Sequence, residues 1–586
     1  MKHLLLSLSL FLMAVTYGFA HERSLSEMQG IAARQFLSAA SVKAKFGSVQ
    51  SLGIRCIQEN AAYAIFEPQS ADAFVIVSKS DLTEAVIGYA EQPFNLADMP
   101  TDLKWFLNSV EKTILKAEAT GTSQYRQAKS YTPVEKFITT IWNQEYPYNQ
   151  KTPNKKYSGC VATALAQCLN YCQWPNSASF ESIYYITSGT MSSGNFKEHK
   201  VAVNSTYTWP YKDTYKKMGS YGDNIDELMR DCGYATYMIY ASDGSGTSTQ
   251  YCGFALTSCF NYPEECVKTL SKEYTDEQTF NETIYEELQR RSPVIMGAHD
   301  NEGGHAFVLC GVDEEGLVWV NWGWGASGDG YYDLSLMNPS GEDPEFVQSP
   351  TIVYGIRPAP LSEDHIVARI NANTNPNTAA PGSYTFRWDT EKDDEGVPHP
   401  TLFIQIPYGF ENMNGSSFSG NFGIFGQDLT DGSTWVIAPE LQDPTEIPAG
   451  AGWYADNEDF YYYYFVDGEE GLKPGHTYRL SFGACDEREG VWHSVLCVGG
   501  ERAYDVTYTG DVTTSTVNPT PQPVPLVDAI TAPTANTLAA DGFTRVYDLQ
   551  GRLLYTALTA SFNLWEVPAR GILVIKQGDK ARKVVR

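Results

Sequence analysis

The sequence has few histidines and a shortage of cationic side chains for its length. Its 586 residues include 9 His and 42 Lys or Arg, against 70 Asp or Glu, which gives a net charge of −28. Nucleic acid is therefore not an expected partner, because binding to phosphates needs clustered Lys and Arg. After the first twenty residues no uninterrupted apolar run reaches the roughly 18 residues of a membrane span, so we expect no membrane anchor.

The first twenty residues are typical of a secretory signal peptide. Lys2 gives a positive start, Leu4 to Val15 is almost wholly apolar, and Gly18-Phe19-Ala20 offers small residues at the cleavage positions. We therefore expect an exported protein whose signal peptide comprises residues 1–20.

Eleven cysteines form an odd set, which leaves at least one thiol free in an exported chain. Cys168 and Cys172 are spaced i, i+4 on a predicted helix, a spacing that a metal pair would also have. No second pair has matching ligand spacing, so we interpret both as core residues and expect no metal and no cofactor.

Composition divides the rest of the chain into five regions, and the fold class we predict is α+β. The helix and strand patterns favour a small α+β module at 21–125, then a catalytic domain at 126–358 with helices first and strands afterwards. Short strands between Gly, Pro, Asn and Asp turns predict β-sandwich-like structure at 359–512. A Pro-rich linker is predicted at 513–527 and a β-rich end at 528–586.

The stretch from Tyr157 to Gln167 predicts a reactive cysteine. A Ser158-Gly159 turn precedes Cys160, and good helix formers follow, so Cys160 should lie at a helix N-terminus with Ser158 available as a cap. The helix dipole and unpaired N–H groups there favour the thiolate, which is the nucleophilic form. The alternative is a structural cysteine buried under a helix, and only a base elsewhere in the chain decides between them.

His305 is the best candidate for that base. It follows Gly303-Gly304 and begins the predicted strand that continues through Cys310. A second predicted strand, Val318 to Asn321, leads into Trp322-Gly323-Trp324-Gly325. If the two strands pair, Asn321 or Trp322 lies beside His305, where an amide oxygen could hold the imidazole N–H and an indole could exclude water.

The other histidines lie in the signal peptide, at its cleavage point, in polar loops or in the turn-rich β region: His3, His21, His199, His299, His365, His399, His476 and His493.

Gln144 is a candidate for the oxyanion hole. A glutamine shortly before a nucleophilic cysteine can donate its side-chain N–H to the developing oxyanion, together with the backbone N–H of Cys160. Most glutamines are surface residues, so Gln144 gains weight only from its place in the order Gln, Cys, His, Asn.

These motifs together resemble the streptopain family of bacterial cysteine proteases, through Ser158 to Ala164, Gly304 to Val308, Val320 to Gly325 and Asp329 to Tyr332. The resemblance implies a papain-like fold in which Cys160 and His305 are the catalytic pair and Gln144 completes the oxyanion hole. It also places Asn321, Trp322 and Trp324 beside the active site. The stretch from Gln144 to Cys160 is shorter than in streptopain, so the loop there should differ.

Two further resemblances concern the ends of the chain. Phe74 to Ser78, Val86 to Tyr89 and Met99-Pro100 are similar to the family's inhibitory pro-domain, which implies a zymogen cleaved within 118–135. Arg545 to Arg552, Ala569 to Lys576 and Lys583 to Arg586 resemble the type IX secretion sorting domain of Bacteroidetes. That resemblance implies secretion machinery as a partner and a secreted or cell-surface location, whereas a solvated basic tail is the alternative.

We therefore expect a secreted cysteine endopeptidase made as a zymogen, with protein or peptide substrates and its own pro-domain as intramolecular inhibitor. The alternative is an inactive surface adhesin or binding protein that uses its C-terminal β-domains, motivated by the aromatic run from Phe460 to Phe465.

Overall fold

The computed structural model describes part of the chain and divides it into two compact units. Unit 1 comprises Met1–Tyr131, Asp313–Trp319 and Ser327–Glu342; unit 2 comprises Thr132–Val312, Val320–Ala326 and Asp343–Arg586. The described residues are 22–38, 53–69, 72–124, 131–211, 224–300, 304–337, 346–362, 364, 369–374, 382–437, 445–454, 460–467, 471–489, 491–525, 543–547, 553–558, 572–577 and 580–585. The predicted signal peptide lies outside them.

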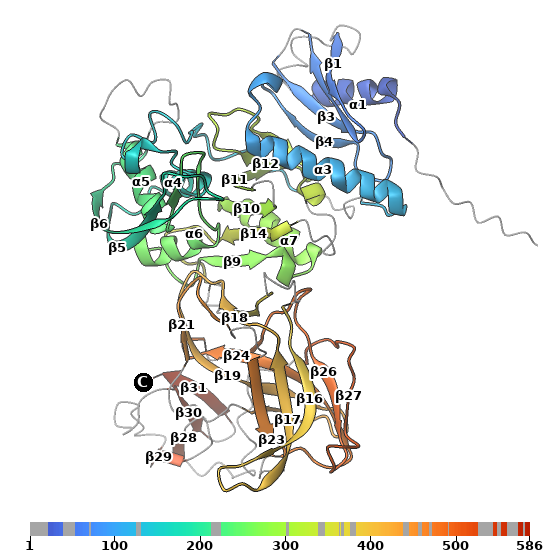
Figure 1. Cartoon of the computed structure of the whole chain (residues 1–586), viewed down its shortest axis with the longest axis vertical. Coiled ribbons are helices and arrows are strands. Elements are labelled where there is room, and N and C mark those ends of the chain that lie inside the picture. The colour runs from blue at the N-terminus through green and yellow to red at the C-terminus, as the bar shows by residue number, and fades with distance from the viewer. Residues whose placement is uncertain are drawn as a thin grey trace, which may run out of the picture. The chain divides into compact units, whose positions relative to one another are not determined.

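Unit 1 begins with an amphipathic helix on an antiparallel sheet (Figure 1). Helix α1 (Leu25–Ser38) starts with a capping box, in which Ser24 N–H donates to Glu27 Oε2 at 2.7 Å. Its buried residues recur at helical spacing and pack against alternate residues of the sheet, as the sequence predicts. The sheet strands are β1 (Ile54–Glu59), β2 (Tyr63–Pro68), β3 (Phe74–Ser78) and β4 (Val86–Ala90), followed by η2 (Leu96–Asp98) and α3 (Thr101–Thr120).

A later segment of the chain completes this sheet. Strand β13 (Gly330–Tyr332) pairs antiparallel with β4, with Tyr331 opposite Tyr89 and Tyr332 opposite Gly88. The rings of Tyr89 and Tyr331 stack at 5.2 Å. A Cβ on Gly88 would lie 2.6 Å from the Tyr332 ring, so glycine lets the two strands approach. The short helix η7 (Leu334–Met337) follows, and Thr113 Oγ1 of α3 donates to the Leu336 carbonyl at 3.0 Å.

Unit 2 contains the buried helix α4 (Cys160–Cys172). Residues Val161 to Asn170 are all buried, so this helix is covered on every side rather than on one face. It packs against α5 (Ile225–Ala235) and β11 (Gly304–Val312). The other helical elements are η3 (Pro153–Lys155), α6 (Tyr251–Phe254), the π-helical turn η5 (Ala255–Cys259), η6 (Lys272–Tyr274) and α7 (Glu277–Gln289).

Two groups of strands accompany these helices. In the first, β11 is followed in order by β10 (Val294–Asp300), β14 (Phe346–Tyr354) and β9 (Lys268–Ser271), and Ala298 of β10 lies opposite His305 of β11. Strand β12 (Val318–Asn321) begins in unit 1 and ends in unit 2. The second group is β6 (Lys197–Thr206), β5 (Ser177–Ile186), β7 (Ile239–Tyr240) and β8 (Ser245–Gly246).

Two histidines are not in loops as predicted. His299 lies on β10, and His199 lies on β6, where its ring stacks on Tyr184 at 5.2 Å. The paired strand β5 supplies an aromatic neighbour that the polar sequence around His199 does not reveal.

The described residues between 369 and 525, called the β-domain below, are β-rich and form three sheets. Its apolar core draws on all three sheets and includes Phe410, Leu402, Phe422, Phe482 and Val506. The strands are β15 (Ile370–Ala372), β16 (Thr385–Lys392), β17 (Pro398–Ile406), β18 (Gly409–Asn412), β19 (Phe418–Asp428), β20 (Thr434–Ile437), β21 (Thr445–Ile447), β22 (Gly452–Tyr454), β23 (Phe460–Phe465), β24 (His476–Asp486), β25 (His493–Ser494), β26 (Tyr504–Tyr508) and β27 (Thr516–Val517).

The Pro-rich segment is not a free linker along its first part. Strand β27 pairs with β26, and Gln522 N–H donates to the Ala503 carbonyl at 2.7 Å. Proline lacks only its own N–H donor, so residues between prolines still pair with a neighbouring edge.

The C-terminal residues form a separate four-stranded antiparallel sheet. Its order is β29 (Leu553–Leu558), β28 (Phe543–Tyr547), β30 (Ile572–Gln577) and β31 (Lys580–Val585), which agrees with the β-rich pattern predicted for this end. Among the helices in the described ranges, none is both long enough and apolar enough to cross a membrane.

Candidate active site

Cys160 is the first residue of α4. Its side chain is partly exposed although the following ten residues are buried. The N-cap is Gly159 at φ 90°, and a Cβ there would lie 2.7 Å from Met238 Cε, so the turn that presents Cys160 requires glycine. The start of α4 at Cys160 is the position that the sequence predicts.

Ser158 does not cap this helix, so that expectation is wrong. The N-cap position is occupied by Gly159, and no side chain caps α4. Ser158 lies one residue earlier, where its Oγ contacts Thr163 Oγ1 at 3.1 Å and its N–H donates to the Gln144 carbonyl at 3.0 Å.

The hydrogen bond from Ser158 brings Gln144 to the start of α4. Gln144 is 5% exposed, and its backbone N–H donates to Asn143 Oδ1 at 2.6 Å. Within the described ranges, the side-chain amide of Gln144 makes no hydrogen bond. An N–H donor is thus available beside the turn that carries Cys160.

His305 is held by a backbone carbonyl at the end of β12. Its Nε2 lies 2.7 Å from the Trp322 oxygen. A carbonyl can only accept, so Nε2 carries the proton and the neutral ring has its lone pair on Nδ1. The ring is 4% exposed and stacks between aromatic rings, with centroid distances of 6.2 Å to Phe307, 6.2 Å to Trp322 and 6.4 Å to Trp324.

Asn321 holds the loop rather than the imidazole. Its Nδ2 donates to the Thr140 carbonyl at 2.7 Å, and its Oδ1 accepts from Gly323 N–H at 3.0 Å and from Gln167 Nε2 at 3.1 Å. Thr140 Oγ1 donates to Gln167 Oε1 at 2.6 Å and closes the network. Of the two residues predicted beside His305, Trp322 therefore supplies the acceptor, and it does so through its backbone.

Sequence reasoning missed Thr140 and Gln167. Both are buried, at 4% and 0% exposure, and they connect the Gln144 segment and α4 to Asn321. Gln167 could have been suspected, since it is a long polar side chain in a helix rich in apolar residues. Thr140 carries no comparable signal.

The Trp-Gly loop is fixed to the same two segments. Trp322 is fully buried and Trp324 is partly exposed. Gly325 N–H donates to the Trp142 carbonyl at 2.9 Å, and a Cβ on Gly323 would lie 3.1 Å from Thr163 Cγ2. The structure thus gathers Gln144, Cys160, His305, Asn321, Trp322 and Trp324 into one connected part of unit 2.

Burial accounts for eight of the other ten cysteines, whereas Cys56 and Cys172 are partly exposed. All eleven are free thiols. Of the two cysteines that the sequence assigns to the core, Cys168 is fully buried and Cys172 is only partly buried. Burial raises the pKa of Cys168 well above its ordinary value, which leaves it unreactive.

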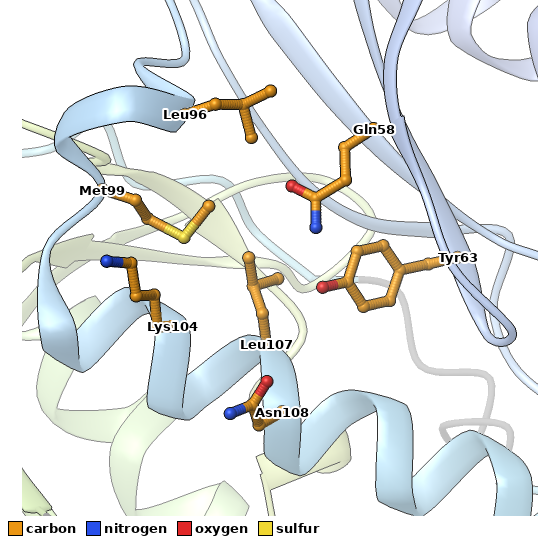
Figure 2. A pocket seen from close by; sticks show the side chains of 7 residues that line it. All are labelled: Gln58, Tyr63, Leu96, Met99, Lys104, Leu107 and Asn108. Carbon is orange, nitrogen blue, oxygen red and sulfur yellow. The ribbon is translucent and has the colours of Figure 1, made fainter.

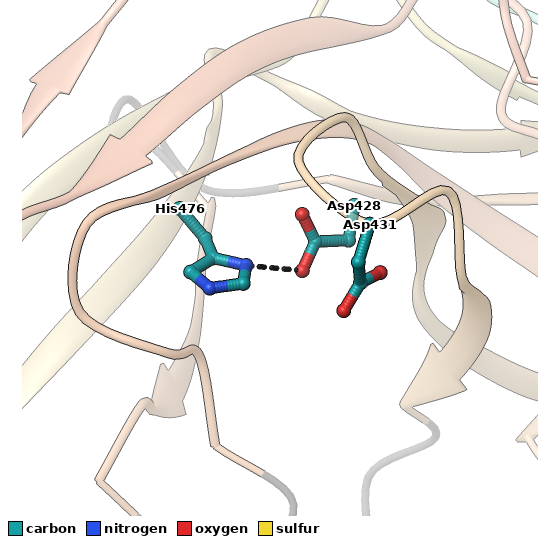
Figure 3. A group of neighbouring side chains, drawn as sticks. All are labelled: Asp428, Asp431 and His476. Atoms are coloured by element: carbon teal, nitrogen blue, oxygen red, sulfur yellow. Dashed lines mark hydrogen bonds and ion pairs between the residues drawn. The ribbon is translucent and has the colours of Figure 1, made fainter.

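One described group resembles a metal site, namely Asp428, Asp431 and His476 of the β-domain (Figure 3). Its ligand atoms already have protein partners. Asp428 Oδ2 lies 2.7 Å from His476 Nδ1, and Asp431 Oδ2 lies 2.8 Å from Lys473 Nζ. The Lys473 ammonium, with Ser433, lowers the pKa of Asp431. A hydrogen bond and the Asp431–Lys473 ion pair therefore already occupy these ligand atoms.

A pocket of about 410 Å³ lies in unit 1 (Figure 2). Figure 2 shows Tyr63 and Gln58 facing Leu107 and Met99 across it. The lining residues are Gln58, Tyr63, Leu96, Met99, Lys104, Leu107 and Asn108, none of which is a candidate site residue. Burial, with Glu111 nearby, raises the pKa of Tyr63 to about 12, so its hydroxyl stays protonated.

The aromatic strand β23 contributes more to packing than to the surface. Tyr462 and Tyr464 pack against the core of the β-domain, whereas Tyr463 is 55% exposed and its ring lies tilted against that of Phe403, with the centroids 6.0 Å apart. This alternation is that of an ordinary half-buried strand, so the aromatic run gives less support to the adhesin alternative.

Comparison with known proteins gives two family matches. Residues 142–332 match the Peptidase C10 family, and residues 25–114 match the Spi protease inhibitor family. The thiol protease/hemagglutinin PrtT of Porphyromonas gingivalis is 29% identical over 334 residues, which cover 52% of this chain but only 38% of that protein. Streptopain of Streptococcus pyogenes is 28% identical over 293 residues, 46% of this chain and 73% of streptopain. A solved prointerpain A fragment of Prevotella intermedia is 29% identical, with a TM-score of 0.45, over 52% of this chain and 99% of the fragment.

The fold class predicted from the sequence, α+β with a papain-like catalytic domain, is confirmed by the family match and by the order of elements in it, with Cys160 on α4 and His305 on the later strand β11. The Spi match likewise identifies the region before it as an inhibitor-type pro-domain. The chain carries a cysteine peptidase domain of the Peptidase C10 family.

Proposed function

We propose that this protein is a cysteine endopeptidase made as a zymogen, with Cys160 as nucleophile and His305 as general base. The observation that supports these roles best is the bond from His305 Nε2 to the Trp322 carbonyl. It leaves Nδ1 as the proton acceptor of the neutral ring, which is the state a general base needs.

The reaction follows from these groups. His305 Nδ1 takes the proton from Cys160 Sγ, and the thiolate attacks the peptide carbonyl carbon. The Gln144 side-chain N–H and the Cys160 backbone N–H stabilise the oxyanion, and loss of one such donor costs about 2.7–4 kcal/mol in other hydrolases. The imidazolium then protonates the leaving amine, and water hydrolyses the thioester with His305 again as base.

The relatives support the assignment to the cysteine proteases. PrtT is named a thiol protease, and streptopain belongs to the family whose motifs this sequence shares. We further propose that protein or peptide chains are the substrates and that residues 25–114 inhibit the peptidase domain of the same chain.

Export rests on the two ends of the sequence. The signal-like residues 1–20 and the sorting-domain resemblance of the C-terminal strands support passage to the cell surface or the medium by the type IX machinery. The test is to truncate the native chain after residue 527. The protein should then accumulate inside the cells, and unchanged secretion would exclude a sorting role.

The catalytic assignment is tested by Cys160→Ala in the full chain, with Cys172→Ala as the control, because Cys172 is a partly buried thiol of the same helix. Cys160→Ala should abolish casein cleavage and self-maturation, whereas Cys172→Ala should retain both. If the Cys160 variant still matures and cleaves casein, Cys160 is not the nucleophile.

A further inference from the structure

Residues 245–257, called the bridge segment below, contact the backbone beside both catalytic candidates. At Gly159, which precedes Cys160, a Cβ would lie 3.1 Å from the Ser245 carbonyl oxygen. At Gly297, a Cβ would lie 2.1 Å from Thr249 Oγ1 and 3.1 Å from the His305 carbonyl oxygen. The bridge segment therefore lies against the turn that presents Cys160 and against the strand next to His305.

The bridge segment also carries Cys252, which is fully buried in α6. Burial, and to a smaller extent the nearby Cys160, raises the pKa of the Cys252 thiol. This influence agrees with the position that the two glycine contacts give the segment, next to the nucleophile.

The β-domain contacts the same segment at its next residues. Gln250 Nε2 donates to Glu411 Oε1 at 3.3 Å. A Cβ on Gly450 would lie only 2.6 Å from Cε1 of Tyr251, so the Gly450 backbone lies directly against that ring.

Two further contacts extend this junction. A Cβ on Gly415 would lie 2.9 Å from the Gly253 carbonyl oxygen, and Thr257 Oγ1 donates to the Gly415 carbonyl. Glycine at both positions lets the two backbones meet without an intervening side chain.

The bridge segment has little regular structure to hold its own position. Helix α6 has 4 residues and continues into the π-helical turn of 5 residues. Helices this short are not stable by themselves, so packing on both sides sets where the segment lies. π-Helical turns occur often at functional sites.

We propose that the β-domain positions the bridge segment and thereby sets substrate binding beside Cys160, with Gly450 and Glu411 as positioning residues. The polypeptide substrate of the proposed peptidase would lie along this segment, and the inference rests on that proposed function. The β-domain would then be a working part of the enzyme rather than a spacer.

Gly450→Ala in the matured full-chain enzyme tests the inference, with Gly432→Ala as the matched control. Both glycines lie in the left-handed region, at φ 69° and 79°, so alanine is strained at each. Only at Gly450 does the new Cβ meet Tyr251, because nothing lies within 4 Å of it at Gly432. Gly450→Ala should lower kcat/KM on peptides about tenfold, mainly through KM, since small displacements at an active site have effects of this size or larger.

A second variant separates positioning from instability. Gly450→Ala combined with Tyr251→Leu removes the ring atom that the alanine meets, so KM should return toward that of Tyr251→Leu alone. Alkylation of Cys160 by iodoacetamide should proceed at the same rate in all variants, because the small reagent does not use the bridge segment.

The outcomes are distinct from a failure of the proposed function. An unmutated chain that hydrolyses no peptide would refute the peptidase assignment itself. An active enzyme in which Gly450→Ala and Gly432→Ala have the same kcat and KM would overturn the positioning role.

Discussion

The contrast between Asn321 and Gln167 tests how His305 is oriented. Asn321 makes hydrogen bonds with Thr140, Gly323 and Gln167, and Gln167 makes one with Asn321 and one with Thr140. All are buried and neutral, so each contributes about 1 kcal/mol. Asn321→Ala should lower the free energy of unfolding by about 3 kcal/mol and Gln167→Ala by about 2 kcal/mol, as measured by urea denaturation.

The double variant adds a check on the network itself. The two residues share one bond, so Asn321→Ala with Gln167→Ala should lose about 4 kcal/mol rather than the sum of about 5 kcal/mol. A strictly additive result would mean that the two amides do not interact.

Activity gives the decisive readout. If the Trp322 carbonyl orients His305, both single variants should lower kcat/KM on a peptide substrate to a similar extent, about tenfold, through the loosened loop. The acid limb of the pH–rate profile should not move, because the bond to Nε2 survives. A loss of roughly 10⁴ in kcat for Asn321→Ala, with Gln167→Ala nearly inert, is what removal of a direct histidine partner produces and would refute this reasoning.

Three other predictions concern the turn at Gly159, the contact of Glu411 with the bridge segment, and the N-cap of α7. Gly159→Ala should abolish soluble active enzyme, because the residue lies at φ 90° and the new Cβ would meet Met238. Gly121→Ala is the control, since Gly121 lies at φ 66° but has nothing within 4 Å of the new Cβ. It should lower the free energy of unfolding by only about 1 kcal/mol and keep activity. Burial raises the pKa of Glu411, which faces Gln250, Tyr251, Tyr274 and Glu273. Its contribution to stability is therefore full below the ordinary carboxyl pKa and is lost as pH rises through the raised pKa. Glu411→Gln should flatten this pH dependence of the melting temperature, and an unchanged slope would exclude a contribution from Glu411. Asp276 caps α7 by accepting hydrogen bonds from Thr279, and these bonds lower the Asp276 pKa. The stabilisation by this cap is present above the ordinary carboxyl pKa and is lost as pH falls through the lowered pKa. Asp276→Ala should therefore lower the free energy of unfolding by about 1 kcal/mol at pH 7 and by progressively less in acid.

The sequence was informative wherever the signal is local. The short apolar runs Phe74 to Ser78 and Val86 to Tyr89 predicted β3 and β4, and the Ser-Gly-Cys turn predicted the start of α4 at Cys160. The cap was mispredicted because the helix begins directly at Cys160, so Gly159 occupies the N-cap position and Ser158 lies one residue before it.

Contacts between residues distant in the chain could not be predicted from the sequence. The acceptor for His305 is a backbone carbonyl, which every residue possesses, so Trp322 carries no special mark for that role. The Thr140 and Gln167 contacts with Asn321 join residues distant in the chain, and side-chain type alone cannot show that they meet.

The pairing of β13 with β4 links maturation to the peptidase domain itself. Strand β13 lies within the residues that match the Peptidase C10 family, whereas β4 lies within those that match the inhibitor family. In the proposed zymogen, cleavage within 118–135 followed by release of the pro-domain would remove β4 and open the edge of β13 that pairs with it. An unpaired edge with exposed aromatic rings is unfavourable in water. The mature enzyme must therefore rearrange or cover β13. In the intact chain the pairing with β4 avoids this cost, so it favours the bound state of the pro-domain until cleavage.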